Sequence, residues 1–101
     1  MVEAKVKNLL GLAMRAGKVV SGEENCNISI KKDSHLIIVA RDASANTTKK
    51  FINRCKFFNV PLRLAATKRE LGMAIGRGDR AVVSIADKGF AKELIRYIDC
   101  N

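Results

Sequence analysis

Apolar residues follow two patterns along this chain: in some segments they lie three or four positions apart, and in others they form continuous runs. The first pattern predicts helices and the second predicts buried strands. The first segment carries apolar residues three or four positions apart: Val2, Val6, Leu9, Leu10 and Ala13. This spacing is typical of an amphipathic helix, and Gly17 is a usual residue just past a helix C-terminus. We therefore predict a helix that ends before Gly17, followed by a very short strand over residues 18–20.

Two further segments are apolar without polar alternation. The segments 35–40 and 81–86 are each almost unbroken apolar runs rich in β-branched residues. Such strands are buried on both faces and lie in the middle of a sheet that helices cover on each side. Residues 62–65 form a further short strand candidate. With the helices between them, these segments predict an α/β fold, a three-layer α/β/α sandwich.

Two helix starts have the spacing of a capping box, in which a hydroxyl residue precedes Glu by three positions. Ser21 and Glu24 have this spacing, and we predict that they open a second helix running to about Lys32. Thr67 and Glu70 repeat the pattern before a short helix.

Asp42 and Asp87 each follow a buried strand, a position where α/β enzymes often carry catalytic groups. Asp is also a preferred helix N-cap residue, and helices are predicted over residues 48–58 and after residue 87. Capping is therefore the favoured interpretation of both carboxylates. His35 has no nearby acidic or thiol partner in the sequence, so we interpret it as a strand-end residue rather than a general base.

Length and charge narrow the classes of function. The chain has 101 residues, of which 48% are hydrophobic and 29% charged, a composition typical of one globular domain. No apolar run approaches the ~20 residues of a membrane-spanning helix. A net charge of +9 predicts a polyanionic partner, nucleic acid before an anionic membrane surface. The charge is spread over both halves of the chain, so folding must assemble any basic patch.

Metal and catalytic chemistry find little support in the sequence. Cys26, Cys55 and Cys100 lack the spacing of zinc ligands, and their odd number argues against a secreted disulfide framework. No side chain stands in a nucleophile elbow, and the glycines of residues 72–78 do not match a phosphate-binding loop. We expect no metal, no cofactor, no catalytic residue and a reducing, cytoplasmic compartment.

Two segments carry stronger signs of nucleic-acid binding. In the first, residues 21–25, Gly22 leaves the backbone open to a phosphate or base edge, and Glu24 and Asn25 can exchange hydrogen bonds with base edges. A capped helix start with solvated polar residues would explain this segment equally well. The second is the loop over residues 76–80, with two glycines and two arginines. Binding groups concentrate in loops on a rigid scaffold.

Five short motifs occur in register and together resemble one family. They are LGLAMRAGKVVSG at 10–22, IIVARDA at 37–43, NVP at 59–61, LGMAIG at 71–76 and DKGFA at 87–91. The chain resembles the kink-turn RNA-binding ribosomal proteins of the large-subunit "L-seven-Ae" type, and most closely their small bacterial YlxQ-like members. The resemblance covers essentially the whole chain.

The resemblance implies a four-stranded mixed sheet and a single RNA-binding domain over residues 1–101. It also implies that the start of the second helix and the loop before the last strand form one RNA surface. Kink-turn binders read Gly-x-Asn-Glu-x-x-Lys at the helix start. Gly22 matches this pattern, but Glu24 stands in place of Asn, Asn25 in place of Glu and Ile28 in place of Lys. We therefore expect RNA binding in which phosphate contacts survive and sequence preference is reduced.

These observations predict a monomeric, non-enzymatic protein that binds structured RNA, with kink-turn or ribosomal RNA as ligand, the ribosome as a candidate partner and no membrane contact. The residues expected to form the RNA surface are Lys18, Ser21, Gly22, Glu23, Glu24, Asn25, Lys31, Lys32, Gly72, Gly76, Arg77, Gly78 and Arg80. The alternative is a protein-interaction module that has lost specific RNA recognition and docks through the basic residues of the third helix.

Overall fold

The computed structural model describes residues 2–100 and the side chains of residues 4–100, so the side chain of Val2, predicted on the apolar face of the first helix, lies outside it. Helices and strands alternate along these residues. They are α1 (Val2–Arg15), β1 (Val19–Ser21), α2 (Glu23–Ser29), β2 (Leu36–Val39), α3 (Ala45–Phe58), β3 (Leu62–Leu64), α4 (Lys68–Ala74), β4 (Val82–Ile85) and α5 (Lys88–Asp99).

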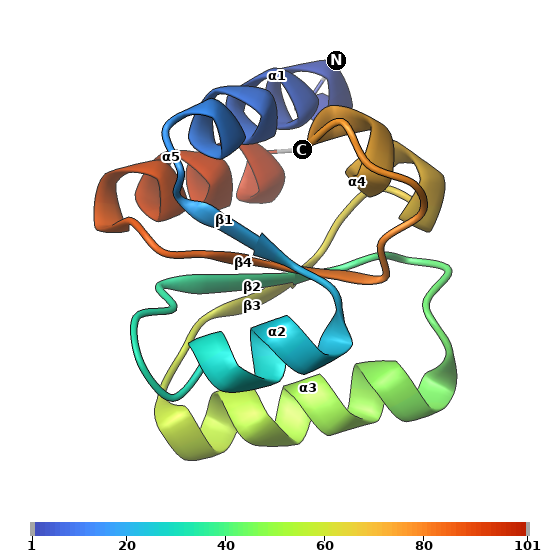
Figure 1. The fold of residues 1–101 in the computed structure, drawn as a ribbon, viewed down its shortest axis with the longest axis vertical. Coiled ribbons are helices and arrows are strands. Elements are labelled where there is room, and N and C mark those ends of the chain that lie inside the picture. The colour runs from blue at the N-terminus through green and yellow to red at the C-terminus, as the bar shows by residue number, and fades with distance from the viewer. Residues whose placement is uncertain (1, 101) are drawn as a thin grey trace.

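The four strands form one mixed sheet in the order β1-β4-β2-β3. Strand β4 is antiparallel to both of its neighbours, while β2 and β3 run parallel. Helices α1, α4 and α5 cover one face of the sheet, and α2 and α3 cover the other (Figure 1). The predicted three-layer sandwich with a four-stranded mixed sheet is confirmed.

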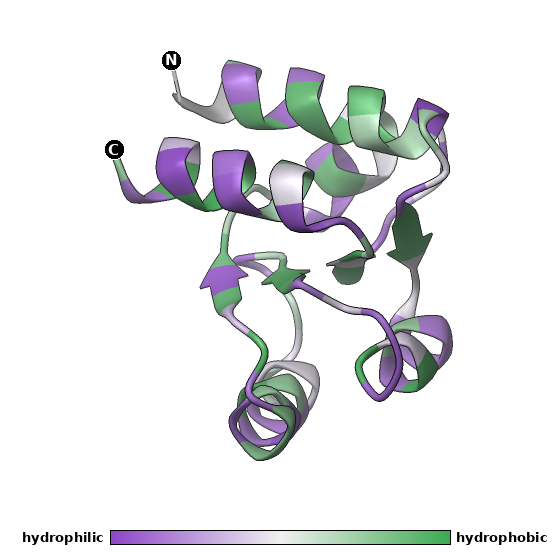
Figure 2. Cartoon of the chain, turned by 90° about the vertical axis from the view of Figure 1, so that its left-hand side faces the viewer, coloured by the Kyte–Doolittle hydropathy of each residue, from purple (hydrophilic) through white to green (hydrophobic). Residues whose placement is uncertain are grey.

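The two central strands explain the unbroken apolar runs, because every residue of β2 and β4 is buried. Alternate residues face opposite cores. Those on the side of α1, α4 and α5 are Leu36, Ile38, Val83 and Ile85, and those on the side of α2 and α3 are Ile37, Val39 and Val82. Figure 2 shows the hydrophobic strands between two layers of helices. Ser84, a buried polar residue of β4, has its hydroxyl 2.9 Å from that of Ser29 on α2.

Two helix starts have the predicted capping chemistry. Thr67 and Glu70 form the complete capping box of α4, with the Thr67 hydroxyl accepting from the Glu70 backbone N–H and the Glu70 carboxylate accepting from that of Thr67. The Asp87 carboxylate accepts from the Phe90 N–H at 2.8 Å and so caps α5.

The predicted capping box of Ser21 and Glu24 is wrong. Ser21 is the last residue of β1, and the N-cap of α2 is Gly22, which has no side-chain capping bond. Ser21 belongs to β1 because Ser21 pairs with Val83 of β4. Helix α2 also ends at Ser29, three residues before the predicted end near Lys32.

Asp42 is not the N-cap of the helix that follows it in the sequence. Ser44 is the N-cap of α3, accepting from the Thr47 N–H. The Asp42 carboxylate instead accepts from the Lys68 N–H at 2.8 Å, at the first residue of α4. The predicted N-cap role of Asp42 is therefore wrong: Thr67 is the N-cap of α4, and Asp42 contributes a carboxylate from the end of β2 to the first N–H of that helix.

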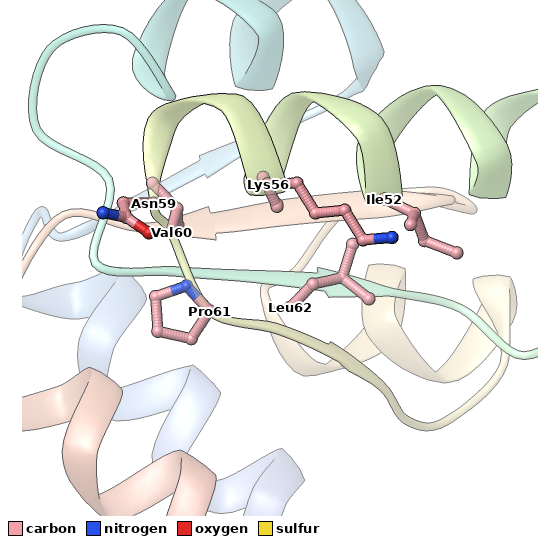
Figure 3. Close-up of a pocket in the computed structure, with 7 residues that line it drawn as sticks. Ile52, Lys56, Asn59, Val60, Pro61 and Leu62 are labelled. Atoms are coloured by element: carbon pink, nitrogen blue, oxygen red, sulfur yellow. The ribbon is translucent and has the colours of Figure 1, made fainter.

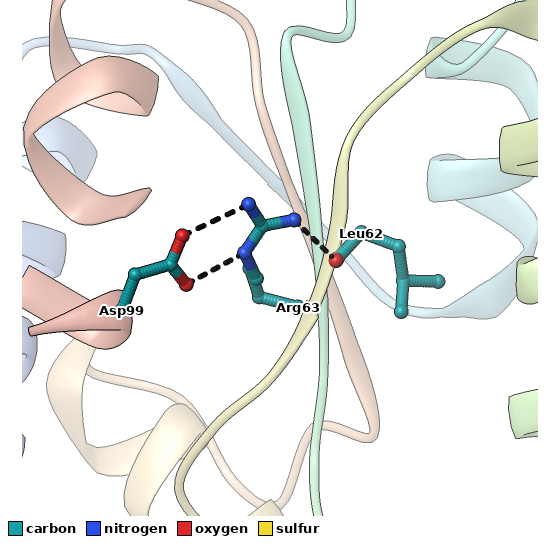
Figure 4. Close-up of polar contacts among 3 residues, drawn as sticks. All are labelled: Leu62, Arg63 and Asp99. Atoms are coloured by element: carbon teal, nitrogen blue, oxygen red, sulfur yellow. Dashed lines mark hydrogen bonds and ion pairs between the residues drawn. The ribbon is translucent and has the colours of Figure 1, made fainter. Parts of the chain in front are cut away.

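The edge strand β3 is joined to the end of α5 by an exposed ion pair (Figure 4). Arg63 donates through Nε and Nη2 to the two carboxylate oxygens of Asp99, at 2.8 and 3.0 Å, and through Nη1 to the Leu62 carbonyl. This hydrogen-bonded pairing lowers the pKa of Asp99 below its ordinary value. The Arg63 side chain therefore also provides a hydrogen-bond donor for the Leu62 carbonyl of the edge strand.

Candidate nucleic-acid interface

The start of α2 and the segment before β4 lie side by side. Residues 21–25 and 79–81 line one depression of about 460 Å³. The Gly22 N–H donates to the Val82 carbonyl at 3.1 Å, and Arg80 Nε donates to the Ser21 hydroxyl at 3.2 Å. Segments far apart in the sequence therefore share a surface.

Strand pairing is the cause of this proximity. In the antiparallel pair of β1 and β4, Ser21 at the end of β1 lies opposite Val83 near the start of β4. The chain leaves β1 directly into α2 and enters β4 from the loop at residues 76–80. Figure 1 shows the blue turn into α2 beside the orange segment that enters β4.

Arg80 is the cation that spans the depression. Besides its bond to Ser21, the guanidinium donates through Nη1 to the carbonyls of Gly78 and Asp79, at 3.2 and 2.9 Å. Its backbone N–H donates to the Lys68 carbonyl at the start of α4. These bonds hold the side chain in one orientation, partly exposed, between the loop and the end of β1.

The start of α2 contributes acidic and amide groups. Gly22 has a φ of 93°, a left-handed conformation that favours glycine. Glu23, Glu24 and Asn25 are exposed, and the Asn25 amide donates to the Ser21 carbonyl at 3.2 Å. The depression therefore combines carboxylates, an amide and a guanidinium.

Gly72 supports the loop from beneath rather than lying on the surface. It is buried in α4, and a Cβ at this position would lie 2.1 Å from the Gly78 carbonyl oxygen. The Arg77 N–H donates to the Gly72 carbonyl at 2.8 Å. The loop carrying the exposed residues Gly76, Arg77 and Gly78 thus folds directly onto α4.

Seven of the predicted site residues do not line the depression. Gly72, Gly76, Arg77 and Gly78 lie on α4 and the loop beside it, and Lys18, Lys31 and Lys32 lie elsewhere. Lys18 precedes β1, and Lys31 and Lys32 follow α2, so a strand or a helix separates each of them from Gly22. The seven residues of α2 span about 10 Å. Lys31 instead borders a separate depression on α3 that includes Arg54 and Phe57. The structure therefore brings residues 21–25 together with Arg80. The lining also includes Asp79, which lies in the predicted loop but was not among the predicted residues, and Ala81, whose only sequence signal is its position beside Arg80.

Cys26 holds α2 against the sheet below the depression. Its buried thiol lies 3.5 Å from the Val20 carbonyl and 3.7 Å from the Val82 carbonyl, so it contacts both β1 and β4. Burial, followed by the negative charge of Glu23, raises the pKa of the Cys26 thiol to about 12. Because the thiolate is the reactive form of cysteine, the folded protein keeps this thiol unreactive near neutral pH.

The hollow between α3 and β3 lacks this mixture of groups. This hollow of about 430 Å³ is lined mainly by aliphatic parts of residues such as Ile52, Val60, Pro61 and Leu62, with Lys56 at its border (Figure 3). Among residues 2–100, no three His, Cys, Asp or Glu side chains are grouped so as to hold a metal ion. No helix within that range is long and apolar enough to cross a membrane.

Comparisons with known proteins identify the class. Residues 4–95 match the model of the ribosomal protein L7Ae/L30e/S12e/Gadd45 family, so the chain belongs to that family.

Individual relatives are consistent with this assignment. The chain is 42% identical over 92 residues to "RNA-binding protein YlxQ" of Bacillus subtilis, covering 90% of this chain and 92% of the relative. It is 30% identical over 99 residues to "Large ribosomal subunit protein eL8" of Thermoplasma volcanium, covering 96% and 82%. A solved structure of a protein of unknown function from Bacillus halodurans has a TM-score of 0.92 at 35% identity, covering 95% of this chain and 98% of the other. The 15.5kD RNA binding protein of Giardia lamblia shares the fold, with a TM-score of 0.83 at 19% identity, covering 98% and 88%.

The contact between Gly72 and the loop predicts unequal effects of two alanine substitutions. Gly72→Ala places a methyl group against the Gly78 backbone, and we expect a loss of about 1–3 kcal/mol in the free energy of unfolding. Gly78→Ala is the matched control, because a Cβ there meets nothing within 4 Å, and we expect a change within about 0.5 kcal/mol. Urea denaturation measures both, and equal stability of the two variants would contradict the packing described above.

The raised pKa of Cys26 predicts a loss of stability at alkaline pH. The thiol ionises near 9.0 in the unfolded chain but near 12 in the folded protein, so unfolding releases a proton above pH 9 and becomes easier as the pH rises. Cys26→Ser keeps a hydroxyl donor but does not titrate there. We expect wild type to lose stability relative to C26S by on the order of 1 kcal/mol per pH unit between about pH 9 and 10.5, measured by urea unfolding. Parallel pH curves for the two proteins would show that Cys26 is not held protonated.

Proposed function

We propose that this protein is a non-enzymatic, cytoplasmic RNA-binding protein of ribosomal type that acts as a monomer. The observation that carries the proposal is the shared depression of residues 21–25 and 79–81, which combines groups for base edges with a fixed arginine. The net charge of +9 and the RNA-binding and ribosomal names of its relatives support RNA as the ligand.

The charges in the depression suggest how an RNA strand would lie. Carboxylates of Glu23, Glu24 and Asp79 repel phosphates, but they accept hydrogen bonds from base amino groups such as cytosine N4. Arg77 and Arg80 lie on the loop side and suit the phosphate backbone. We therefore place the backbone along the loop and the base edges over the start of α2.

A kink-turn is the candidate RNA shape, and ribosomal RNA is its candidate source. The resemblance implies that Gly-x-Asn-Glu at this helix start contacts a kink-turn, and Gly22 keeps the first position of that pattern. The amide of Asn25 is engaged with the Ser21 carbonyl, whereas the Glu24 carboxylate is exposed at the border of the depression. Glu24 is therefore our candidate for the residue that reads a base edge.

Arg77 provides a test of the phosphate contact. Arg77→Ala removes an exposed cation from the loop, and we expect weaker binding of every RNA tested, with the log–log dependence of affinity on salt falling by about one unit. Lys92→Ala on the exposed side of α5 is the charge-matched control and should change neither quantity. Mobility shifts on a kink-turn RNA, a plain hairpin and duplex DNA at rising salt measure both.

Two results of these mobility shifts would contradict the proposed RNA binding. If wild type binds none of these nucleic acids at low salt, RNA binding is wrong and the protein-interaction alternative is favoured. If K92A weakens binding as much as R77A, the protein attracts RNA by its net charge alone and the loop beside the depression makes no specific phosphate contact.

Glu24 provides a test of base reading. Glu24→Ala removes a negative charge, so affinity for the plain hairpin should stay constant or rise. If Glu24 contacts a base edge, affinity for the kink-turn should fall relative to the hairpin by about tenfold, within the ~1–3 kcal/mol of a good base contact. Glu93→Ala, which removes a carboxylate from α5, should leave the ratio of the two affinities unchanged. An unchanged ratio in E24A would show that Glu24 does not read the RNA.

A further inference from the structure

A second concave surface lies between α1 and α4. It is a groove of about 520 Å³, and its lining includes Lys7, Gly11, Leu12, Arg15 and Met73. None of its lining residues belongs to the depression at Gly22 and Arg80. The groove is therefore a separate site, although the loop at residues 76–80 continues directly from α4.

The groove exposes apolar side chains that folding does not use. Leu12 is 48% exposed and Met73 is 67% exposed, so neither is among the buried residues that form the two hydrophobic cores described above. Their helix neighbours Leu9, Met14 and Ala74 do pack against the core beneath α1 and α4. Leu12 and Met73 thus border the same groove from two helices, where burial by a partner would remove apolar area from water.

Gly11 gives the groove its floor. Glycine inside a helix costs about 1 kcal/mol relative to alanine, so its presence in the middle of α1 needs a structural reason. A Cβ at Gly11 would lie 3.3 Å from the Ala74 carbonyl oxygen, so glycine allows the backbones of α1 and α4 to approach closely. The side chains of Leu12 and Met73 are left beside this contact as the two apolar sides of the groove.

The border of the groove is predominantly basic. Lys7 and Arg15 line it on α1, and Arg69 lies one helical turn before Met73 on α4. Glu70 lies 3.7 Å from the Lys7 ammonium group and offsets part of its charge. An occupant of complementary chemistry would therefore carry apolar side chains at its centre and acidic side chains at its edges.

A protein helix matches these properties better than a nucleic-acid strand does. Single-stranded nucleic acids bind largely by stacking their bases on aromatic side chains, and the lining of this groove contains no aromatic residue. Methionine and leucine are characteristic of grooves that accept the apolar face of an amphipathic helix. We propose that the α1/α4 groove docks an acidic amphipathic helix of a partner protein, through Leu12 and Met73.

Peptide display tests the chemistry that this groove selects. The probe is a library of random peptides about four helical turns long, selected on the full chain and counter-selected on the double variant Leu12→Ser, Met73→Ser. We expect enrichment of acidic peptides with apolar residues at positions i, i+3 or i+4, and i+7. By fluorescence anisotropy, the selected peptides should bind the double variant at least about tenfold more weakly than wild type.

A matched variant separates the groove from general exposure of apolar groups. Phe57→Ser removes a side chain that is 82% exposed on α3, in the opposite helix layer, and it should leave peptide affinity unchanged. Circular dichroism and the mobility shifts described above should show that the double variant keeps its fold and its RNA affinity, so this test is independent of the proposed RNA site.

Three outcomes would overturn the proposal. The first is a selection that yields no peptide whose binding depends on Leu12 and Met73. The second is enrichment of basic peptides or of peptides without helical spacing. The third is loss of affinity for a short single-stranded RNA, rather than for peptides, in the double variant, which would make the groove part of the nucleic-acid surface.

Discussion

The antiparallel pairing of β1 with β4 is the constraint on which the candidate site depends. Strand β1 has only three residues, yet its pairing fixes Ser21 opposite Val83 and leaves the Gly22 N–H within reach of the Val82 carbonyl. The start of α2 and the end of the loop at residues 76–80 are brought together by this register. A slip of one residue would turn every side chain of β1 to the other face of the sheet and would move Gly22 away from Arg80.

So short a strand needs support from the layer beneath it. Cys26 supplies part of that support, because its thiol contacts carbonyls of both β1 and β4 from near the start of α2. Ser29 continues the attachment at the other end of the helix, through its hydroxyl contact with Ser84. Helix α2 is thus held at two points, which compensates for residues of poor helix propensity such as Asn25 and Asn27.

The sequence allowed the layers of the fold to be predicted because the signals were local and strong. The unbroken apolar runs of β2 and β4 require burial on both faces, and the capping chemistry of Thr67 and Asp87 acts within three residues. The failures have one physical origin. Ser21 and Asp42 have hydroxyl or carboxylate groups suited to local capping, but partners far along the chain, Arg80 and the Lys68 N–H, take those groups instead.

The residues predicted for the candidate site also fall into two groups, those chosen from local sequence signals and those chosen for their charge. Gly22 and Arg80 could be chosen from the sequence because glycine and arginine next to helix and strand ends are locally recognisable, and the resemblance placed them together. Lys18, Lys31 and Lys32 were selected for charge, which carries no information about position. Helix α2 runs away from the depression, so Lys31 and Lys32 beyond its far end do not line it. Net charge thus predicts a polyanionic class of ligand, whereas strand register decides which side chains lie together.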